Sequence, residues 1–335
     1  MAEEKKITQT KSFFRLHGII MNKDTVNSKG KKGFTEGKTK NNDNYRALKF
    51  MVKTSSSNMV PVEMFGMPRD KVYLYNKKLP KGSNTKSVAW KDRNKDIKDY
   101  ELIKPEFDST LEYEEKFKDG EFVCVVGKIE FSTYYDERRK ETVEQTKYIM
   151  TNIYEVDATK KSTDLNSEDF EEDSVFEQEI IIDESIEMRD EEKLVVNAKV
   201  IGYKTTAPAV FEISLVENAK LARNIRKLKA GDFLKVSGII NNRAVKEAVE
   251  SNEDEWGNGK EVKSITKYIK CLEINRAYPD TLEKKKYTME ELASIGKADE
   301  AKKINESKKT LENLEKLEDD DNNDNDDLPF GLDED

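Results

Sequence analysis

Apolar and polar positions alternate along several short runs of the chain, which is the period-two pattern of half-buried β-strands. Residues 45–54 (YRALKFMVKT) show it clearly, because Leu48, Phe50 and Val52 alternate with positions that face away from a core. Similar runs predict further strands at residues 12–23, 59–66, 193–204 and 209–216, the last with Phe211, Ile213 and Leu215 facing inward. The chain is therefore predicted to be mostly β-structure.

Two pairs of segments repeat each other in the same order. KFKDGEFVCVVGKI (116–129) matches KLKAGDFLKVSGII (227–240), and residues 146–156 and 266–276 both begin with TKYI. Each pair is predicted to form a hairpin, with a glycine at a bend where a Cβ would crowd the neighbouring backbone. Self-similarity of this kind indicates one fold used twice.

Each half of the chain shows a long first strand, shorter strands, a variable connection and a glycine-marked hairpin, which is the strand plan of the five-stranded OB-fold. The prediction is an all-β protein of two tandem OB-fold (Greek-key) barrels, at residues 1–160 and 193–287. The other predicted segments are an insertion at about 67–115 with its own hairpin, an acidic linker at 161–192, a helical segment at 288–318 and a disordered acidic tail at 319–335.

Two stretches carry helix signals. Residues 217–228 (ENAKLARNIRKL) are predicted to form a short helix inside the variable connection of the second barrel. Thr288 is a predicted N-cap, and Glu291 completes a capping box, so helices are expected to begin there and to run toward Leu317.

Charge is distributed unevenly. The formal net charge is -9, but residues 164–192 hold 14 acidic residues against one basic residue, and residues 318–335 hold 10 acidic residues and no basic one. The two bodies between these acidic stretches are mildly basic. Because the Debye length is about 8 Å at physiological salt, a surface responds to local charge, and both bodies are candidate polyanion binders.

The cysteines and the hydropathy pattern bound the compartment. Cys124 and Cys271 lie inside apolar runs and are predicted to be small buried hydrophobic residues rather than a disulfide, which favours a reduced compartment. Neither a signal peptide nor a membrane span is predicted. A cytoplasmic location is therefore expected, in the host cytoplasm if the protein is viral.

The sequence contains few residues that could support catalysis. His17 is the single histidine, and no nucleophile, zinc or phosphate-loop motif is present. The best candidate is Asp254 with Glu261-Val262-Lys263, a pattern that would suit a Mg²⁺-dependent nuclease. Such a pattern arises easily by chance in a chain with 38% charged residues. The prediction is a non-catalytic protein with no catalytic residue, metal or cofactor.

Four segments resemble, in order, the strands of single-stranded DNA-binding proteins: FRLHGIIMNKD, YRALKFMVKT, VPVEMFG and DGEFVCVVGKI. DDLPF near the C-terminus resembles the acidic tip of that family. The duplicated barrel and the long insertion depart from the short bacterial form and look more like a phage or viral version. The resemblance implies a protein that coats and protects single-stranded DNA in replication, recombination and repair. The alternative is an OB-fold replication or recombination mediator that acts mainly as a protein–protein adaptor.

The predicted DNA-binding residues lie in and between two loops of the first barrel, at 23–44 and 132–145. Both loops combine cations, which neutralise phosphates, with aromatic rings, which stack on bases. The candidate set is Arg15, Lys29, Lys31, Lys32, Phe34, Lys38, Tyr45, Lys49, Lys53, Tyr134, Tyr135, Arg138, Arg139 and Lys140, with Lys23 and Lys40 as further loop cations and Phe13 and Trp90 as weaker candidates. The second barrel has an acidic loop around Trp256 and is predicted to be an auxiliary or self-association module.

The acidic tail carries one apolar triplet. Leu328, Pro329 and Phe330 stand among nine carboxylates in residues 319–335. Solubility needs no Phe, so these three residues are predicted to bind replication or recombination partners, and the tail is also expected to occupy the basic groove when DNA is absent. In the resembled family the Phe is the final residue, whereas here Gly331 to Asp335 follow.

Overall fold

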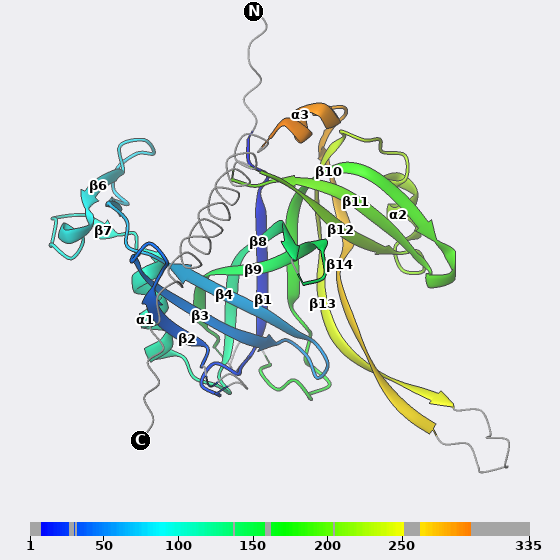
Figure 1. Ribbon diagram of the computed structural model, residues 1–335, viewed down its shortest axis with the longest axis horizontal. Coiled ribbons are helices and arrows are strands. Elements are labelled where there is room, and N and C mark those ends of the chain that lie inside the picture. The colour runs from blue at the N-terminus through cyan, green and yellow to red at the C-terminus, as the bar shows by residue number, and fades with distance from the viewer. Residues whose placement is uncertain are drawn as a thin grey trace, which may run out of the picture.

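The computed structural model describes residues 8–26, 30, 32–136, 138–157, 162–203, 205–250 and 262–295 (Figure 1). Strands dominate these residues, and the predicted all-β class is confirmed at that level. None of the helices in the described part of the chain is both long and apolar enough to cross a membrane.

Five strands of the N-terminal half close into a ring, here called the first ring. They are β1 (Ser12–Met21), β3 (Asn44–Lys53), β4 (Met59–Gly66), β8 (Phe122–Asp136) and β9 (Glu141–Glu155). Pairing runs from β1 through β3, β4, β9 and β8 back to β1, and within this ring β4–β9 is the parallel pair. The short strand β2 (Phe34–Lys38) pairs with the outer part of β3.

Five later strands form the second ring in the same order. They are β10 (Ser174–Met188), β11 (Lys193–Ile201), β12 (Thr206–Ser214), β13 (Phe233–Glu250) and β14 (Val262–Glu283). Here β12–β14 is the parallel pair, and the predicted short helix is confirmed as α2 (Ala219–Ile225). β13 and β14 also stay paired beyond the ring as a long two-stranded arm (Figure 1).

The second ring begins earlier than predicted. β10 lies within residues 161–192, which were predicted to be an acidic linker. Phe176, Gln178 and Ile180 are buried, whereas Glu177 and Glu179 between them stay partly exposed. The carboxylates therefore line the outside of a strand, and residues 193–201 form the second strand of the ring rather than its first.

The matched glycines occupy equivalent bulges. β8 shifts register at Gly127, and β13 shifts register at Gly238. A Cβ on Gly127 would lie 2.1 Å from the carbonyl oxygen of Ile149, and a Cβ on Gly238 would lie 1.8 Å from that of Glu273. Both bends therefore require glycine, as the sequence repeat predicted.

The second sequence match is offset in the structure. Gly127 pairs with Met150 and Gly238 pairs with Ile274. The first TKYI segment is therefore the structural counterpart of residues 270–273, four residues past its sequence copy. The sequence copy itself lies on the arm, so the identity of these four residues does not mark equivalent positions.

The insertion forms a small lobe of its own (Figure 1). The lobe contains β5 (Lys71–Tyr75), β6 (Thr85–Ala89), the 3₁₀ turn η1 (Trp90–Asp92) and β7 (Glu101–Leu102), and α1 (Glu106–Lys116) follows it beside the first ring. The hairpin predicted there is the β5–β6 pair, and α1 packs against β3 and β4. Trp90 is engaged inside the lobe, because Arg93 lies 4.2 Å over its ring and Phe107 meets it edge-on.

The two rings share one apolar core and a polar junction. β1 pairs with β10, and the aromatic side chains of Phe131 and Phe211 meet across the junction with their centroids 6.0 Å apart. Glu172 accepts hydrogen bonds from Thr54 (2.7 Å) and from Asn58 (2.6 Å), and it forms an ion pair with Arg243 (2.7 Å). These contacts hold the rings in one fixed relation.

A 3₁₀ turn, η2 (Arg189–Glu191), connects β10 to β11. The last described element is α3 (Met289–Ser294), which follows β14 of the second ring. The predicted capping box is confirmed: the Glu291 N–H donates to Thr288 Oγ1 at 3.1 Å, and the Thr288 N–H donates to Glu291 Oε2 at 2.7 Å. The predicted continuation toward Leu317 and the tail at 319–335 lie outside the described residues.

Candidate functional site

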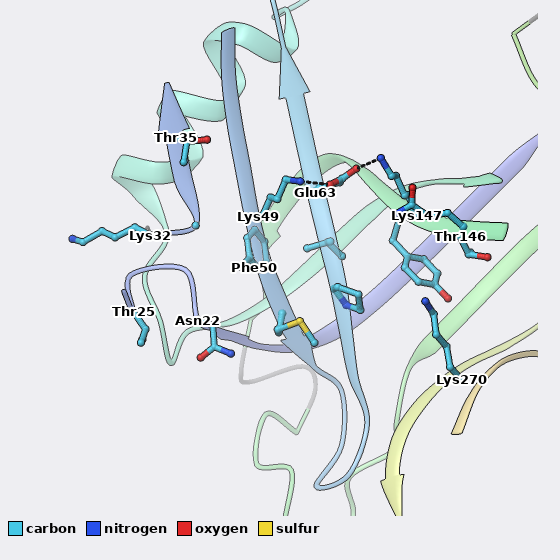
Figure 2. Close-up of a pocket in the computed structure, with 16 residues that line it drawn as sticks. Asn22, Thr25, Lys32, Thr35, Lys49, Phe50, Glu63, Thr146, Lys147 and Lys270 are labelled. Carbon is cyan, nitrogen blue, oxygen red and sulfur yellow. Dashed lines mark ion pairs between the residues drawn. The ribbon is translucent and has the colours of Figure 1, made fainter. Parts of the chain in front are cut away.

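A groove with a volume of about 880 Å³ lies on the outer face of β3 and β4 (Figure 2). One wall is the loop after β1, and the other is the start of β9. Lys270 of β14 reaches the groove from the second ring and points toward the segment that carries Thr146 and Lys147 (Figure 2). The lining residues are Asn22, Thr25, Lys32, Gly33, Thr35, Lys49, Phe50, Met51, Pro61, Val62, Glu63, Gln145, Thr146, Lys147, Tyr148 and Lys270.

Backbone hydrogen bonds tie the first wall to the sheet. The Gly33 N–H donates to the Lys23 carbonyl at 2.8 Å, and the Lys49 N–H donates to the Gly33 carbonyl at 3.0 Å. A Cβ on Gly33 would lie 2.2 Å from the Lys49 carbonyl oxygen, so only glycine allows this approach. The loop is thereby held against β3, which places Lys32 at the rim of the groove (Figure 2).

A carboxylate holds two lysines in the middle of the groove. Glu63 lies 2.8 Å from Lys49 Nζ and 3.5 Å from Lys147 Nζ, so the three side chains form one chain of ion pairs (Figure 2). Burial alone would raise the pKa of Glu63, but hydrogen bonds and charge from Lys49 and Lys147 bring that pKa below its usual value. Glu63 is therefore ionised at neutral pH and fixes the direction of both lysines.

The lining is cationic with an apolar floor. It holds four lysines and one carboxylate, and no ion pair of Lys32 or Lys270 occurs among the described residues. Met51 and Pro61 face each other across β3 and β4 and form the floor. Positive charge above apolar surface suits a ligand that is both anionic and partly apolar.

Two of the predicted residues line the groove, namely Lys32 and Lys49. Lys53 follows on β3, and Lys38 is exposed on β2. Tyr45 stacks on Phe65 with ring centroids 5.7 Å apart, on the same outer face. Lys29 and Lys31 lie outside the described residues.

The β8–β9 hairpin carries its predicted residues away from the groove. Tyr134 and Tyr135 are 47% and 61% exposed, and Arg139 forms ion pairs with Asp136 and Glu141. Arg138 and Lys140 are exposed in the same turn. The groove reaches β9 only from Gln145 onward, so these five residues flank it.

Three predicted residues have other roles in the structure. Phe34 is not a free ring in a loop, because it pairs with Leu48 and packs against the core. Arg15 forms an ion pair with Asp173 at 3.2 Å, beside the β1–β10 junction. Lys23 is fully buried and bonds to Asp24 (2.7 Å) and Glu114 (2.6 Å), so it supports the loop instead of facing a ligand.

The sequence analysis missed two lysines that line the groove, Lys147 and Lys270, and one exposed aromatic side chain, Phe65. Lys147 points outward from β9, on the same side of the sheet as the exposed face of β3 and β4. The alternation of polar and apolar residues in the TKYI segment could have predicted this orientation. Phe65 alternates outward on β4 in the same way and is 53% exposed. Lys270 had no sequence signal, because its position depends on how the two rings pack.

The corresponding face of the second ring carries two lysines, Lys193 and Lys199, and both are ion-paired with carboxylates. Glu212 lies opposite Glu273 in the parallel pair and bonds to Lys193 at 2.9 Å. Burial and the negative charge of Glu217 raise the pKa of Glu273. Directly after α2, Arg226 is engaged by Glu187. This part of the second ring therefore offers a phosphate chain less free positive charge than the groove does.

The nuclease hypothesis gains no structural support. Asp254 and Glu261, like Trp256, lie outside the described residues. Within the part of the chain that the structure describes, no group of three or more His, Cys, Asp or Glu side chains is arranged to hold a metal ion.

The predicted partner-binding residues of the tail, Leu328, Pro329 and Phe330, also lie outside the described part of the chain.

Within the described residues, two five-stranded rings of identical strand order, the first with a lysine-lined groove, define the class of β-protein. The model of the YorF family matches residues 14–313, and the chain belongs to the YorF family. A search of curated proteins found no match.

Two solved structures are similar at low identity. The first, the wild-type single-stranded DNA binding protein from Thermus aquaticus, has a TM-score of 0.40 and 11% identity, and the match covers 81% of this chain and 93% of that one. The second, a variant of the same Thermus aquaticus protein with a deletion and an arginine-to-alanine substitution, has a TM-score of 0.39 and 11% identity, covering 81% of this chain and 95% of that one.

Proposed function

We propose that this YorF-family protein binds single-stranded DNA in the groove on β3 and β4 and catalyses no reaction. The observation that carries the proposal is the lining itself, in which four lysines surround an apolar floor with one carboxylate among them. Lysines neutralise phosphates and release counterions, and an apolar floor accepts bases that are not stacked in a duplex.

We further propose that each ring is an OB-fold. The pairing order is that of a closed five-stranded barrel in which the third and fifth strands are parallel, and both rings follow it. OB-folds bind oligonucleotides across the second and third strands, between the loops that join strands one to two and four to five. The groove occupies this position in the first ring, with Tyr134, Tyr135, Arg138, Arg139 and Lys140 as flanking contacts.

The biological role proposed is to coat and protect single-stranded DNA during replication, recombination or repair in a phage-type system, in the host cytoplasm. The residues at 319–335 would recruit partner proteins through Phe330. Phe330→Ala is expected to abolish capture of replication partners without changing DNA affinity. Deletion of residues 319–335 is expected to abolish capture and also to tighten DNA binding at low salt, because it removes a competing polyanion. Retention of every partner by Phe330→Ala would reduce the tail to charge alone.

A second candidate function is a protein–protein adaptor. The lobe carries an apolar surface on one face of its small sheet, where Tyr73 and Ile103 are 53% and 50% exposed and Tyr75 lies beside them. An adaptor would use this lobe and bind DNA weakly. Strong affinity for oligo(dT) near physiological salt separates the two functions in favour of DNA binding.

The proposed function is tested by titrating intrinsic fluorescence with oligo(dT), oligo(rU) and duplex DNA at several salt concentrations. Preference for oligo(dT) over duplex is expected, with affinity that falls as salt rises, because both stacking and phosphate neutralisation contribute. Equal affinity for duplex and oligo(dT), or affinity independent of salt, would refute it. The oligo(rU) series decides whether RNA is bound as well.

A further inference from the structure

A second, smaller cavity adjoins the groove at the junction of the rings. Its volume is about 220 Å³, and it shares Gln145, Thr146, Tyr148 and Lys270 with the groove. Its remaining lining comes mostly from the second ring, including Val210 of β12. The two cavities therefore adjoin along these four residues, and together they are here called the channel, which leads from the first ring onto the second.

The chemistry of the channel continues across the junction. Lys270 is exposed where the two cavities meet. Beyond it, Val210 is 45% exposed and lies beside Pro208, so the floor is again apolar. One carboxylate, Glu144, lines this part, as Glu63 does in the larger groove. A cation followed by apolar floor is the same combination that suits a nucleotide chain in the first ring.

The channel also has a definite end. Glu212 lies two residues beyond Val210 on the same face of β12, and it stands opposite Glu273 in the parallel pair. Lys193 lies 2.9 Å from Glu212 but also 2.6 Å from Glu191, so the carboxylates here outnumber their shared ammonium and disfavour a phosphate backbone. A nucleic acid strand that follows the channel past Lys270 therefore meets an unfavourable charge after Val210.

The junction is rigid enough to keep the channel formed. Asn58 bridges the rings, because its side chain donates to the Ile240 carbonyl at 2.9 Å and accepts from the Asn242 N–H at 2.8 Å. Glu172 links Asn58 to Arg243 of the second ring. The two parts of the channel therefore keep their alignment without a ligand.

We propose that a single strand of DNA crosses both rings, with Lys270 contacting its backbone at the junction and Val210 lying under its bases on the second ring. The second ring then extends the footprint of one site and is not a separate auxiliary module. This inference rests on the proposed function and adds the path of the strand and its end near Glu212.

The test compares two charge insertions in the second ring. Val210→Glu places a carboxylate in the channel, and Val216→Glu places one at a position that is 68% exposed and outside both cavities. Each variant is titrated with oligo(dT) of about 6 nucleotides, which lies within the roughly 4–16 nucleotides that one OB-fold occupies, and of about 20 nucleotides, which exceeds that range. Val210→Glu is expected to weaken binding of the long oligonucleotide by about tenfold while changing the short one less than about twofold. Val216→Glu is expected to change neither.

A reversed charge guards against a merely structural effect. Val210→Lys is expected to tighten binding of the long oligonucleotide, whereas a packing defect would weaken binding in both Val210 variants. If Val210→Glu binds the long oligonucleotide as the wild type does, the path across the second ring is wrong, and binding in the first ring stands. If the wild type binds neither oligonucleotide, the proposed function itself has failed.

Discussion

Lys23 shows how a single residue can look like a ligand contact and serve the fold instead. Its side chain is fully buried, and its ammonium bonds to two carboxylates at the base of the loop that forms the groove wall. Position in a lysine-rich loop predicted exposure. One of these carboxylates, Asp24, is the next residue, but the other, Glu114, is 91 residues away in the sequence, and no local pattern reveals that contact.

Lys23→Ala is expected to lower the free energy of unfolding by about 2 to 4 kcal/mol, because it leaves Asp24 and Glu114 without their shared partner. Urea unfolding monitored by circular dichroism measures the change. Lys40→Ala, which removes an exposed cation from the same loop, is the matched control and is expected to change stability by less than about 0.5 kcal/mol. Equal effects of the two variants would contradict the buried role of Lys23.

Glu63 is expected to affect DNA binding, whereas Lys23 is expected to affect stability. Glu63→Gln removes the carboxylate that engages Lys49 and Lys147, so both lysines become available to phosphates. Affinity for oligo(dT) at low salt is expected to rise, and the slope of log K against log salt is expected to steepen by about 0.7 for each added phosphate contact. Because the pKa of Glu63 is lowered, this gain is expected throughout neutral pH and should shrink only when acid protonates the wild-type carboxyl. Weaker binding by Glu63→Gln would show that orienting the lysines matters more than their charge.

At the scale of elements, the glycine bulges are the part of the fold that the sequence predicted best. Their signal is local, since a glycine within an apolar strand marks a bend, and the match between residues 116–129 and 227–240 repeats it. β10 is the longest of the strands that were missed, and β2 is another. The alternation of β10 is regular, but its outward positions are carboxylates, and a high density of negative charge is equally typical of a solvated linker.

Gly238→Ala is expected to destabilise the protein by about 2 kcal/mol or more, because the added Cβ would overlap the Glu273 carbonyl oxygen. Gly202→Ala is the control in the same ring, since its Cβ would have its nearest neighbour at 3.6 Å. Thermal unfolding of the two variants measures the difference. Indistinguishable melting temperatures would contradict the bulge geometry.

At the scale of the whole molecule, the junction between the rings decides whether they behave as one unit. Glu172→Ala leaves Thr54, Asn58 and Arg243 without their common acceptor. The rings are then expected to unfold less cooperatively, so that calorimetry shows a broadened or divided transition. Glu171→Ala changes the exposed neighbouring carboxylate and is expected to leave the transition unchanged. A sharp single transition in both variants would show that the shared apolar core alone couples the rings.

The arrangement of the rings also explains what the sequence could not supply about the site. The loop lysines and the outward face of β3 are readable from alternation and composition. Lys270 and the channel toward Val210 arise from packing between two halves of the chain, since Lys270 and Val210 follow Thr146 by 124 and 64 residues in the sequence (270 − 146 and 210 − 146). The sequence predicted an acidic loop around Trp256, which lies outside the described residues, whereas Glu212 and Glu273 lie on the strands β12 and β14.

Single-stranded DNA is expected to bind in the groove of the first ring and not through charge elsewhere on that ring. This is tested by the affinity for oligo(dT), across a salt series, of two double variants that remove the same charge. The first variant, Lys32→Ala with Lys49→Ala, removes two positive charges from the groove. The second, Arg138→Ala with Arg139→Ala, removes two positive charges from the flanking hairpin. The groove variant is expected to bind about tenfold or more weakly, with a salt slope shallower by about 1.4, whereas the hairpin variant is expected to lose less than about threefold. A larger loss in the hairpin variant, with the groove variant binding as the wild type does, would contradict the account.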